Sequence, residues 1–265
     1  MDAPPLPRAL LSRVEDAGLN ASAPPQQRWI DGWMLRFSPG KAKRARCVNA
    51  LARGHLGLDQ KLALCRAVFD EAKLPLVVRI TPFSDPSDLD RRLAAHGMHA
   101  IDDTRVMVCP TLPAIEPEPW PDGVSLQRLS NAAFAQTVGQ LRGSPIAQQQ
   151  AHAQRLDLSP VPFEGWLLKR IDDGAVLACG QIAVEADMVG IYDVFTAVPE
   201  RGRGWSRRLC THLLARSREH GARLAYLQVD ATNGPARAVY RRLGFADGYA
   251  YHYRTPTLPA EEGAA

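Results

Sequence analysis

The sequence predicts an α/β protein of the α+β class, with a mixed, largely antiparallel sheet flanked by helices in each of two domains. A stretch at residues 110–122 contains five prolines, which remove backbone donors and exclude regular helix or central strand. Before it, strand and helix patterns alternate; after it, three consecutive strand patterns precede a strand, a helix and a strand. We therefore expect an N-terminal domain at 1–109, a linker at 110–122, a second domain at 123–256 and a flexible tail at 257–265.

In the first half, apolar residues recur either at helical spacing or in short runs typical of strands. Asp59 precedes one helical run and is expected to cap it, and Gly97 is expected to end another helix. The expected helices cover residues 6–17, 59–72 and 85 or 87 to 97, and the expected strands cover 44–51, 76–80 and 104–108. Residues 28–37 are expected to form a hairpin or a strand.

In the second half, turn residues separate three neighbouring strand patterns. Asp172, Asp173 and Gly174 form one such turn, which is typical of an antiparallel meander. The expected strands cover 124–129, 165–171, 175–185, 188–196, 224–229 and 249–253, and the expected helices cover 131–141, 145–155, 204–220 and 235–243.

Composition and charge exclude several classes of function. The formal charge of +4 is small beside 32 basic and 28 acidic side chains, which argues against a nucleic-acid-binding protein. No apolar run is long enough to span a membrane and the start lacks a secretory signal, so we expect a cytoplasmic protein with no membrane partner. The five cysteines lie far apart without a C-x-x-C pair, so no metal site is expected.

A glycine loop follows the expected strand at 188–196 and leads directly into a helix. It reads Arg201-Gly-Arg-Gly204-Trp-Ser206. Gly202 and Gly204 let the main chain approach a ligand, and the helix N-terminus favours a pyrophosphate. Such a loop can also be a simple turn. A second pattern, running from Asn233 through Ala236 to Tyr240 and on into Leu-Gly-Phe, places Asn233 and Tyr240 on one helix face.

Taken together and in this order, the two patterns resemble the GNAT acetyltransferases over about 130 residues. The first is similar to their coenzyme A signature and the second to their second signature. The resemblance implies that the main chain of Val194, Phe195 and Thr196 meets the pantetheine arm. It also implies that the glycine loop holds the pyrophosphate. The implied coenzyme contacts are Val194, Phe195, Thr196, Arg201, Gly202, Arg203, Gly204, Trp205, Ser206, Arg207, Asn233 and Ala236. Ser206 departs from the family, which has glycine or alanine there.

The resemblance further implies an N-acetyltransferase, an acyltransferase that transfers groups other than aminoacyl. Acetyl-CoA would be its cosubstrate, and a primary amine of a small molecule or peptide would attack directly in a ternary complex. Tyr240 would protonate the leaving thiolate. Gln228 stands where some relatives have a glutamate base, so Asp193 is the first candidate for the base. Water relay, Glu185, Asp230 and His252 remain open.

The first half lacks a comparable glycine loop, so the chain resembles tandem GNAT proteins with a degenerate N-terminal domain. The two halves of the chain end in similar segments, L-D-R-R-L-A-A-H-G-M and V-Y-R-R-L-G-F. This similarity fits an internal duplication, although any amphipathic helix that ends in glycine looks similar. The alternative function is a catalytically silent coenzyme A-binding sensor, which Gln228 and Ser206 keep open. The acceptor, the acyl chain length and a homodimer are not decided by the sequence.

Overall fold

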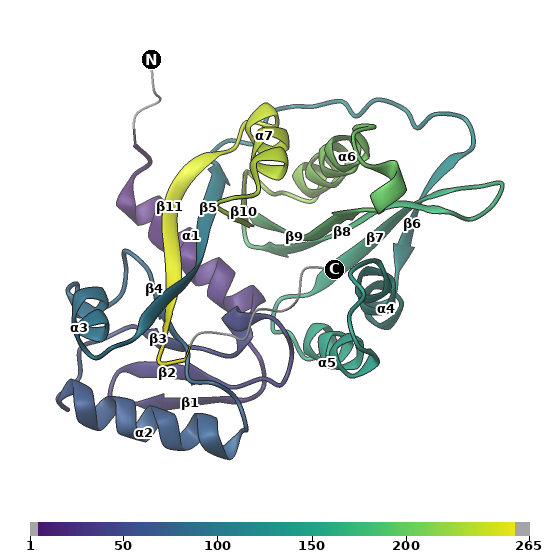
Figure 1. The fold of residues 1–265 in the computed structure, drawn as a ribbon. Coiled ribbons are helices and arrows are strands. Elements are labelled where there is room, and N and C mark those ends of the chain that lie inside the picture. Colours follow the sequence, from purple (N-terminus) through teal and green to yellow (C-terminus); the bar gives the residue numbers. More distant parts are fainter. Residues whose placement is uncertain (1–4, 258–265) are drawn as a thin grey trace. The chain divides into compact units, whose positions relative to one another are not determined.

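The computed structural model describes residues 5–257, which form two compact units (Figure 1). Unit 1 comprises the chain up to Ala23 together with Val106–Gly248. Unit 2 comprises Pro24–Arg105 and the chain from Tyr249 on. Apart from Thr257, the expected tail at 257–265 lies outside the described residues. Within residues 5–257, no helix is long and apolar enough to cross a membrane.

The two units do not follow chain order, unlike the expected domains at 1–109 and 123–256. Helix α1 (Arg8–Ala21) belongs to unit 1, where Gly18 lies beside the side chains of Tyr226 and Gln228. Strand β11 (Ala246–Thr255) starts in unit 1 and ends in unit 2. Strand β5 (His99–Cys109) starts in unit 2 and ends in unit 1. The terminal segments therefore belong to the units that they contact, irrespective of their position in the sequence.

The sheet of unit 1 confirms the expected antiparallel meander and the crossover after it. Its strands are β6 (Val124–Leu129), β7 (Phe163–Arg170), β8 (Val176–Glu185), β9 (Met188–Thr196) and β10 (Leu224–Asp230). The first four pair antiparallel in succession, and β10 returns parallel to β9 after helix α6 (Trp205–Glu219). The order across the sheet is β6-β7-β8-β9-β10-β5-β11.

Helices cover both faces of this sheet (Figure 1). Side chains alternate between the faces along a strand, so Gly180 and Gln181 of β8 point in opposite directions. Gly180 faces Leu209 and Leu213 of α6. Helix α4 (Asn131–Leu141) packs on β7, where the buried Phe134 lies against Gly165. Helix α5 (Ile146–Asp157) packs beside α4 through Gly139 and Gln149. The Gln181 side chain therefore points to the face of the sheet that α4 and α5 cover.

The proline-rich segment at 110–122 contains no helix or strand, and it lies along α6. The Trp120 ring stacks on His212 of α6 with the centroids 3.9 Å apart. The carbonyl of Glu118 is 3.0 Å from His212 Nε2, and its carboxylate pairs with Arg208 at 2.8 Å. Trp120 also contacts the core of unit 1. The segment is therefore a packed part of unit 1.

Unit 2 places two helices on a short sheet. Its strands are β1 (Gln27–Ile30), β2 (Trp33–Arg36), β3 (Val48–Ala50) and β4 (Val78–Ile80), with β11 antiparallel to β4. A 3-10 turn, η1 (Lys43–Ala45), precedes β3. Buried apolar residues of β2, β3 and β4 meet those of helices α2 (Leu58–Glu71) and α3 (Leu89–Ala95) in one core.

One sequence expectation in unit 2 is wrong. Asp59 does not cap α2, because the helix starts one residue earlier and its N-cap is Gly57. Asp59 lies in the first turn, where its carboxylate is 2.8 Å from the ring of His96. An acidic side chain in the first turn still favours the helix through the dipole.

Candidate active site

The pairing of strands β9 and β10 ends before either strand reaches its sequence signature. Their parallel pairing runs from Met188 with Leu224 to Ile191 with Leu227 and stops there. Beyond that pair, β9 continues through residues 192–196 and β10 through 228–230. This stretch of β9 therefore does not pair with β10.

A bulge interrupts the other edge of β9. Cys179 of β8 faces Phe195 and Gln181 faces Tyr192, so Gly180 lies opposite both Asp193 and Val194. Asp193 has φ of 49°, in the left-handed region that few residues other than glycine adopt. Such a bulge bends the strand and increases its twist. The bulge lies directly before Val194, Phe195 and Thr196, whose side chains are all half-buried.

Three side chains from different elements hold the carboxylate of Asp193. Arg142, at the C-terminus of α4, donates to Oδ1 at 2.8 Å, and Gln181 of β8 donates to Oδ2 at 2.6 Å. His152 of α5 lies 3.4 Å from Oδ2. Desolvation raises the pKa of Asp193, but the His152 hydrogen bond and the charges of Arg142, His152 and Arg155 outweigh it and hold the pKa well below its usual range. A carboxylate in this state is a weak proton acceptor.

The glycine loop leaves open space at the start of α6. Gly202 and Gly204 have φ of 79° and 80°, and a side chain added at either would meet nothing within 4 Å. Gly204 is the N-cap of α6. The amides of the first helical turn have no intrahelical partner and lie at the positive end of the dipole, which suits an anion.

Glu200 of the short 3-10 turn η2 (Val198–Glu200) holds this loop in place. It is 8% exposed, and Arg170 donates to it at 3.0 Å. The indole of Trp205 donates to it at 3.3 Å, and Arg203 pairs with it at 3.1 Å. Arg203 and Trp205, both expected at the coenzyme, are therefore bonded to a buried acid that shapes the loop.

The other expected loop residues lie near this opening. The Arg201 guanidinium is 5.6 Å from the centroid of the Phe195 ring, and Arg142 is 5.8 Å from the same centroid. Arg207 is exposed, and its guanidinium lies 3.9 Å from the carboxylate of Glu118. Ser206 is half-buried in the first turn of α6. Arg201 and Arg207 are thus exposed positive charges beside this opening.

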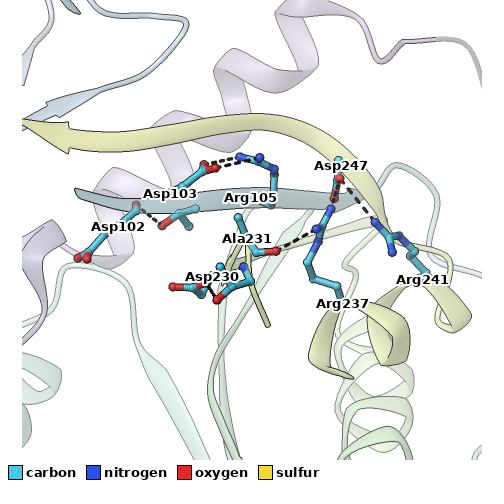
Figure 2. A network of polar contacts seen from close by, with 10 residues as sticks. Asp102, Asp103, Arg105, Asp230, Ala231, Arg237, Arg241 and Asp247 are labelled. Carbon is cyan, nitrogen blue, oxygen red and sulfur yellow. Dashed lines mark hydrogen bonds and ion pairs between the residues drawn. The ribbon is translucent and has the colours of Figure 1, made fainter. Parts of the chain in front are cut away.

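Helix α7 (Gly234–Arg242) presents the residues of the second signature. Asn233 is its N-cap and accepts a hydrogen bond from the Ala236 amide at 3.1 Å. The NH2 group of its side-chain amide carries two donors in addition. Figure 2 shows Arg237 joining the carbonyl of Ala231 to the carboxylate of Asp247, at 3.1 Å and 2.6 Å. These contacts fix α7 between the end of β10 and the start of β11.

Tyr240 lies on α7 with its ring packed into the core of unit 1. The ring meets Phe245 edge-on at 6.0 Å, and Val194, Trp205 and Ala236 pack against the same core. Among the described residues, no hydrogen bond occupies its hydroxyl. Burial, with a smaller effect of Cys210, raises the pKa of Tyr240, so the phenol keeps its proton at neutral pH. It has the protonation state of an acid.

The other candidate bases have structural partners. Glu185 accepts a hydrogen bond from Asn20 at 2.7 Å, and Asp230 accepts two from Thr232 at 2.7 and 2.6 Å. His252 pairs with Asp90 in unit 2 at 2.8 Å. Across residues 5–257, no three His, Cys, Asp or Glu side chains gather as metal ligands would.

Sequence patterns missed four residues that organise this region: Arg142, His152, Gln181 and Glu200. The first three converge on Asp193 from α4, α5 and β8, so no fixed sequence spacing connects them. Glu200 lies beside the glycine loop and carries a weak signal, as an acid among arginines.

The fold and this geometry define the class of protein. An antiparallel meander, a parallel strand that splays from it and a glycine loop at the start of a helix form the GNAT acyltransferase fold. A GCN5-related N-acetyltransferase from Kribbella flavida has the same fold, with a TM-score of 0.65 and 15% identity over 92% of this chain and 94% of that one. A tandem GNAT protein from the clavulanic acid biosynthesis pathway aligns with a TM-score of 0.61 and 17% identity, over 78% of this chain and 70% of that one.

Residues 9–254 match the model of the family described as "Probable histone acetyltransferase Rv0428c C-terminal". The chain belongs to this acetyltransferase family, within the GNAT superfamily. An uncharacterized N-acetyltransferase of Bacillus subtilis, YobR, is 24% identical over 233 residues, which cover 86% of this chain and 91% of that protein.

Proposed function

We propose that the protein transfers the acetyl group of acetyl-CoA to a primary amine of a small molecule or peptide, by direct attack in a ternary complex. The observation that carries this proposal is the end of β9–β10 pairing at Ile191 and Leu227, on the strand that leads to the glycine loop and α6. An extended pantetheine arm can complete the open edge of β9, while the first turn of α6 takes the pyrophosphate.

The same residues support the coenzyme contacts expected from the sequence. Val194, Phe195 and Thr196 would bond the arm through their main chain, and Asn233 would donate to it from α7. Residues 201–207 would hold the phosphates, with Arg201 and Arg207 supplying charge. Ser206 would add a hydroxyl donor there.

In the reaction, the amine must lose a proton and the thiolate must gain one. Amides next to the β9 bulge would stabilise the oxyanion of the tetrahedral intermediate, because the fold already orients these donors before the negative charge develops. Tyr240 would then give its proton to the departing sulfur. Since Asp193 is ion-paired, we propose that water carries the amine proton away.

We expect Tyr240→Phe to lower kcat roughly 100-fold, the usual size of a general-acid contribution, with acetyl-CoA affinity unchanged. Calorimetry measures the affinity, and thiol release against a panel of amines measures turnover. Tyr253→Phe, the same change at a buried tyrosine of unit 2, serves as the control. Equal turnover in Tyr240→Phe and wild type would rule out the acid role. Acetyl-CoA binding without turnover on any amine would favour a sensor, and no binding would contradict the proposal.

A further inference from the structure

Asp193 has an unusual backbone conformation for a residue with a side chain. A φ of 49° is strained for most L-residues and persists only where its surroundings impose it. Aspartate and asparagine tolerate this region better than other residues do.

The contacts come from strand β8 and from the two helices that cover the same face of the sheet, α4 and α5. Gln181 is 1% exposed and directs its amide to Oδ2 from the neighbouring strand. Arg142 reaches the carboxylate from the C-terminal end of α4, and His152 from the middle of α5. The Asp193 side chain is 21% exposed, so solvent screens these contacts only in part. Three partners on two oxygens leave the side chain little freedom to rotate.

The conformation of Asp193 decides where the next amide points. In a bulge with the first residue left-handed, the peptide plane that follows is turned relative to a regular strand. That plane carries the N–H of Val194, on the part of β9 that no longer pairs with β10. Arg142 also contacts the Phe195 ring at 5.8 Å, so one side chain touches both ends of this segment.

We propose that Asp193 is a positioning residue: its carboxylate, clamped by Arg142, Gln181 and His152, locks the β9 bulge and so aims the main chain of Val194. This proposal rests on the proposed function, because the aimed main chain is the one that would meet acetyl-CoA. It assigns Asp193 a role through geometry and leaves proton transfer to other groups. The α4–α5 pair thereby becomes part of the support of the acetyl site.

Two substitutions separate positioning from base chemistry. Asp193→Asn removes the basic carboxylate but retains an acceptor oxygen and tolerates positive φ, whereas Asp193→Ala loses both. We expect Asp193→Asn to lower kcat/KM less than about tenfold, and Asp193→Ala to lower it roughly 100-fold, the effect of a misplaced reacting group. A direct base would make the two variants equally inactive, by roughly 100-fold or more.

Arg142→Met tests the clamp without touching Asp193. We expect Arg142→Met to lower kcat/KM, as Asp193→Ala does. The control is Arg128→Met on β6, which removes an equal charge that pairs with Glu164 of β7 and should leave kcat/KM unchanged. All rates are measured well below the melting temperature of each variant, so that loss of folded protein does not enter. Equal activity of both arginine variants would overturn the clamp.

Amide hydrogen exchange of the free protein reports on the clamp independently of turnover. We expect the peptide covering residues 192–196 to exchange faster in Asp193→Ala than in wild type, and Asp193→Asn to resemble wild type. Unchanged exchange in Asp193→Ala would overturn the proposal. If wild type fails to bind acetyl-CoA but the exchange pattern appears, the proposed function fails while the clamp remains.

Discussion

At the residue scale, Gly204 combines a left-handed backbone with empty space around it. Its φ is 80°, and an added Cβ would meet no atom within 4 Å. Gly123, before β6, has φ of 77° and equally open surroundings. The two glycines therefore share their conformational demand, and only Gly204 lies at the N-terminus of α6. This pair allows the strain of a side chain to be separated from its effect on a ligand.

We expect Gly204→Ala and Gly123→Ala to destabilise the fold alike, by about 1–2 kcal/mol, because each forces an alanine into the left-handed region. Only Gly204→Ala should weaken acetyl-CoA binding, by roughly tenfold or more, since a methyl group there keeps the phosphate from the amides. Thermal unfolding and calorimetry measure the two effects. Unchanged affinity in Gly204→Ala would remove the glycine loop from the binding site.

At the element scale, the contact between α4 and β7 depends on the absence of a side chain at Gly165. A Cβ at this position would lie 2.6–2.7 Å from the ring and Cβ of Phe134, which is fully buried. The close approach sets the distance of α4 from the sheet, and with it the place of Arg142 at the end of α4. The packing of one helix thus reaches the bulge in β9.

We expect Gly165→Ala to destabilise the protein by about 1–3 kcal/mol through overpacking, and to lower the melting temperature by several degrees. Gly40→Ala, where the nearest atom is at an ordinary 3.7 Å, should change it little. Trimming the ring in Gly165→Ala/Phe134→Leu should restore part of the loss, which a double-mutant cycle measures. Additive effects of the two changes would show that the contact is not the cause.

At the scale of the whole molecule, carboxylates with lowered pKa values make the stability of the fold depend on pH in the acidic range. Backbone hydrogen bonds from His55 and Leu56 lower the pKa of Asp31 to about 2, and Lys61 contributes further. Hydrogen bonds and nearby arginines also lower the pKa values of Asp90, Asp173 and Asp193. Burial raises the pKa of Asp16, which acts in the opposite direction.

A carboxyl whose pKa is lower in the folded state binds its proton more readily when unfolded. Its stabilisation is complete above the unfolded value near 3.9 and is lost as the pH falls toward the folded value. We therefore expect the melting temperature to fall between pH 5 and pH 3. Asp31→Asn should lower it at pH 5 and flatten the decline, because its window runs from about 4 to about 2. An equally steep decline in the variant would contradict this assignment.

Much of the fold follows from local signals in the chain. Strands β6 and β9 and helix α4 start and end where turn residues and apolar periodicity place them. Most other boundaries shift by only a few residues, although β5 starts five residues before its expected position. Turn chemistry and periodicity act over a few residues, so the chain carries them wherever it folds. The order of the two signatures predicted the superfamily, which the family match confirms.

The environment of the candidate site required the tertiary structure. The sequence indicates only that Asp193 is an acidic residue of a strand and a candidate base. Its partners on α4, β8 and α5 come close to it only in the folded chain. Sequence patterns likewise did not indicate that the N-terminal helix belongs to unit 1 and the end of β11 to unit 2. The physical reason is the same in both cases. Strand pairing and ion pairing join residues by position in space, and contacts across 12 to 51 residues leave no periodic trace in the chain.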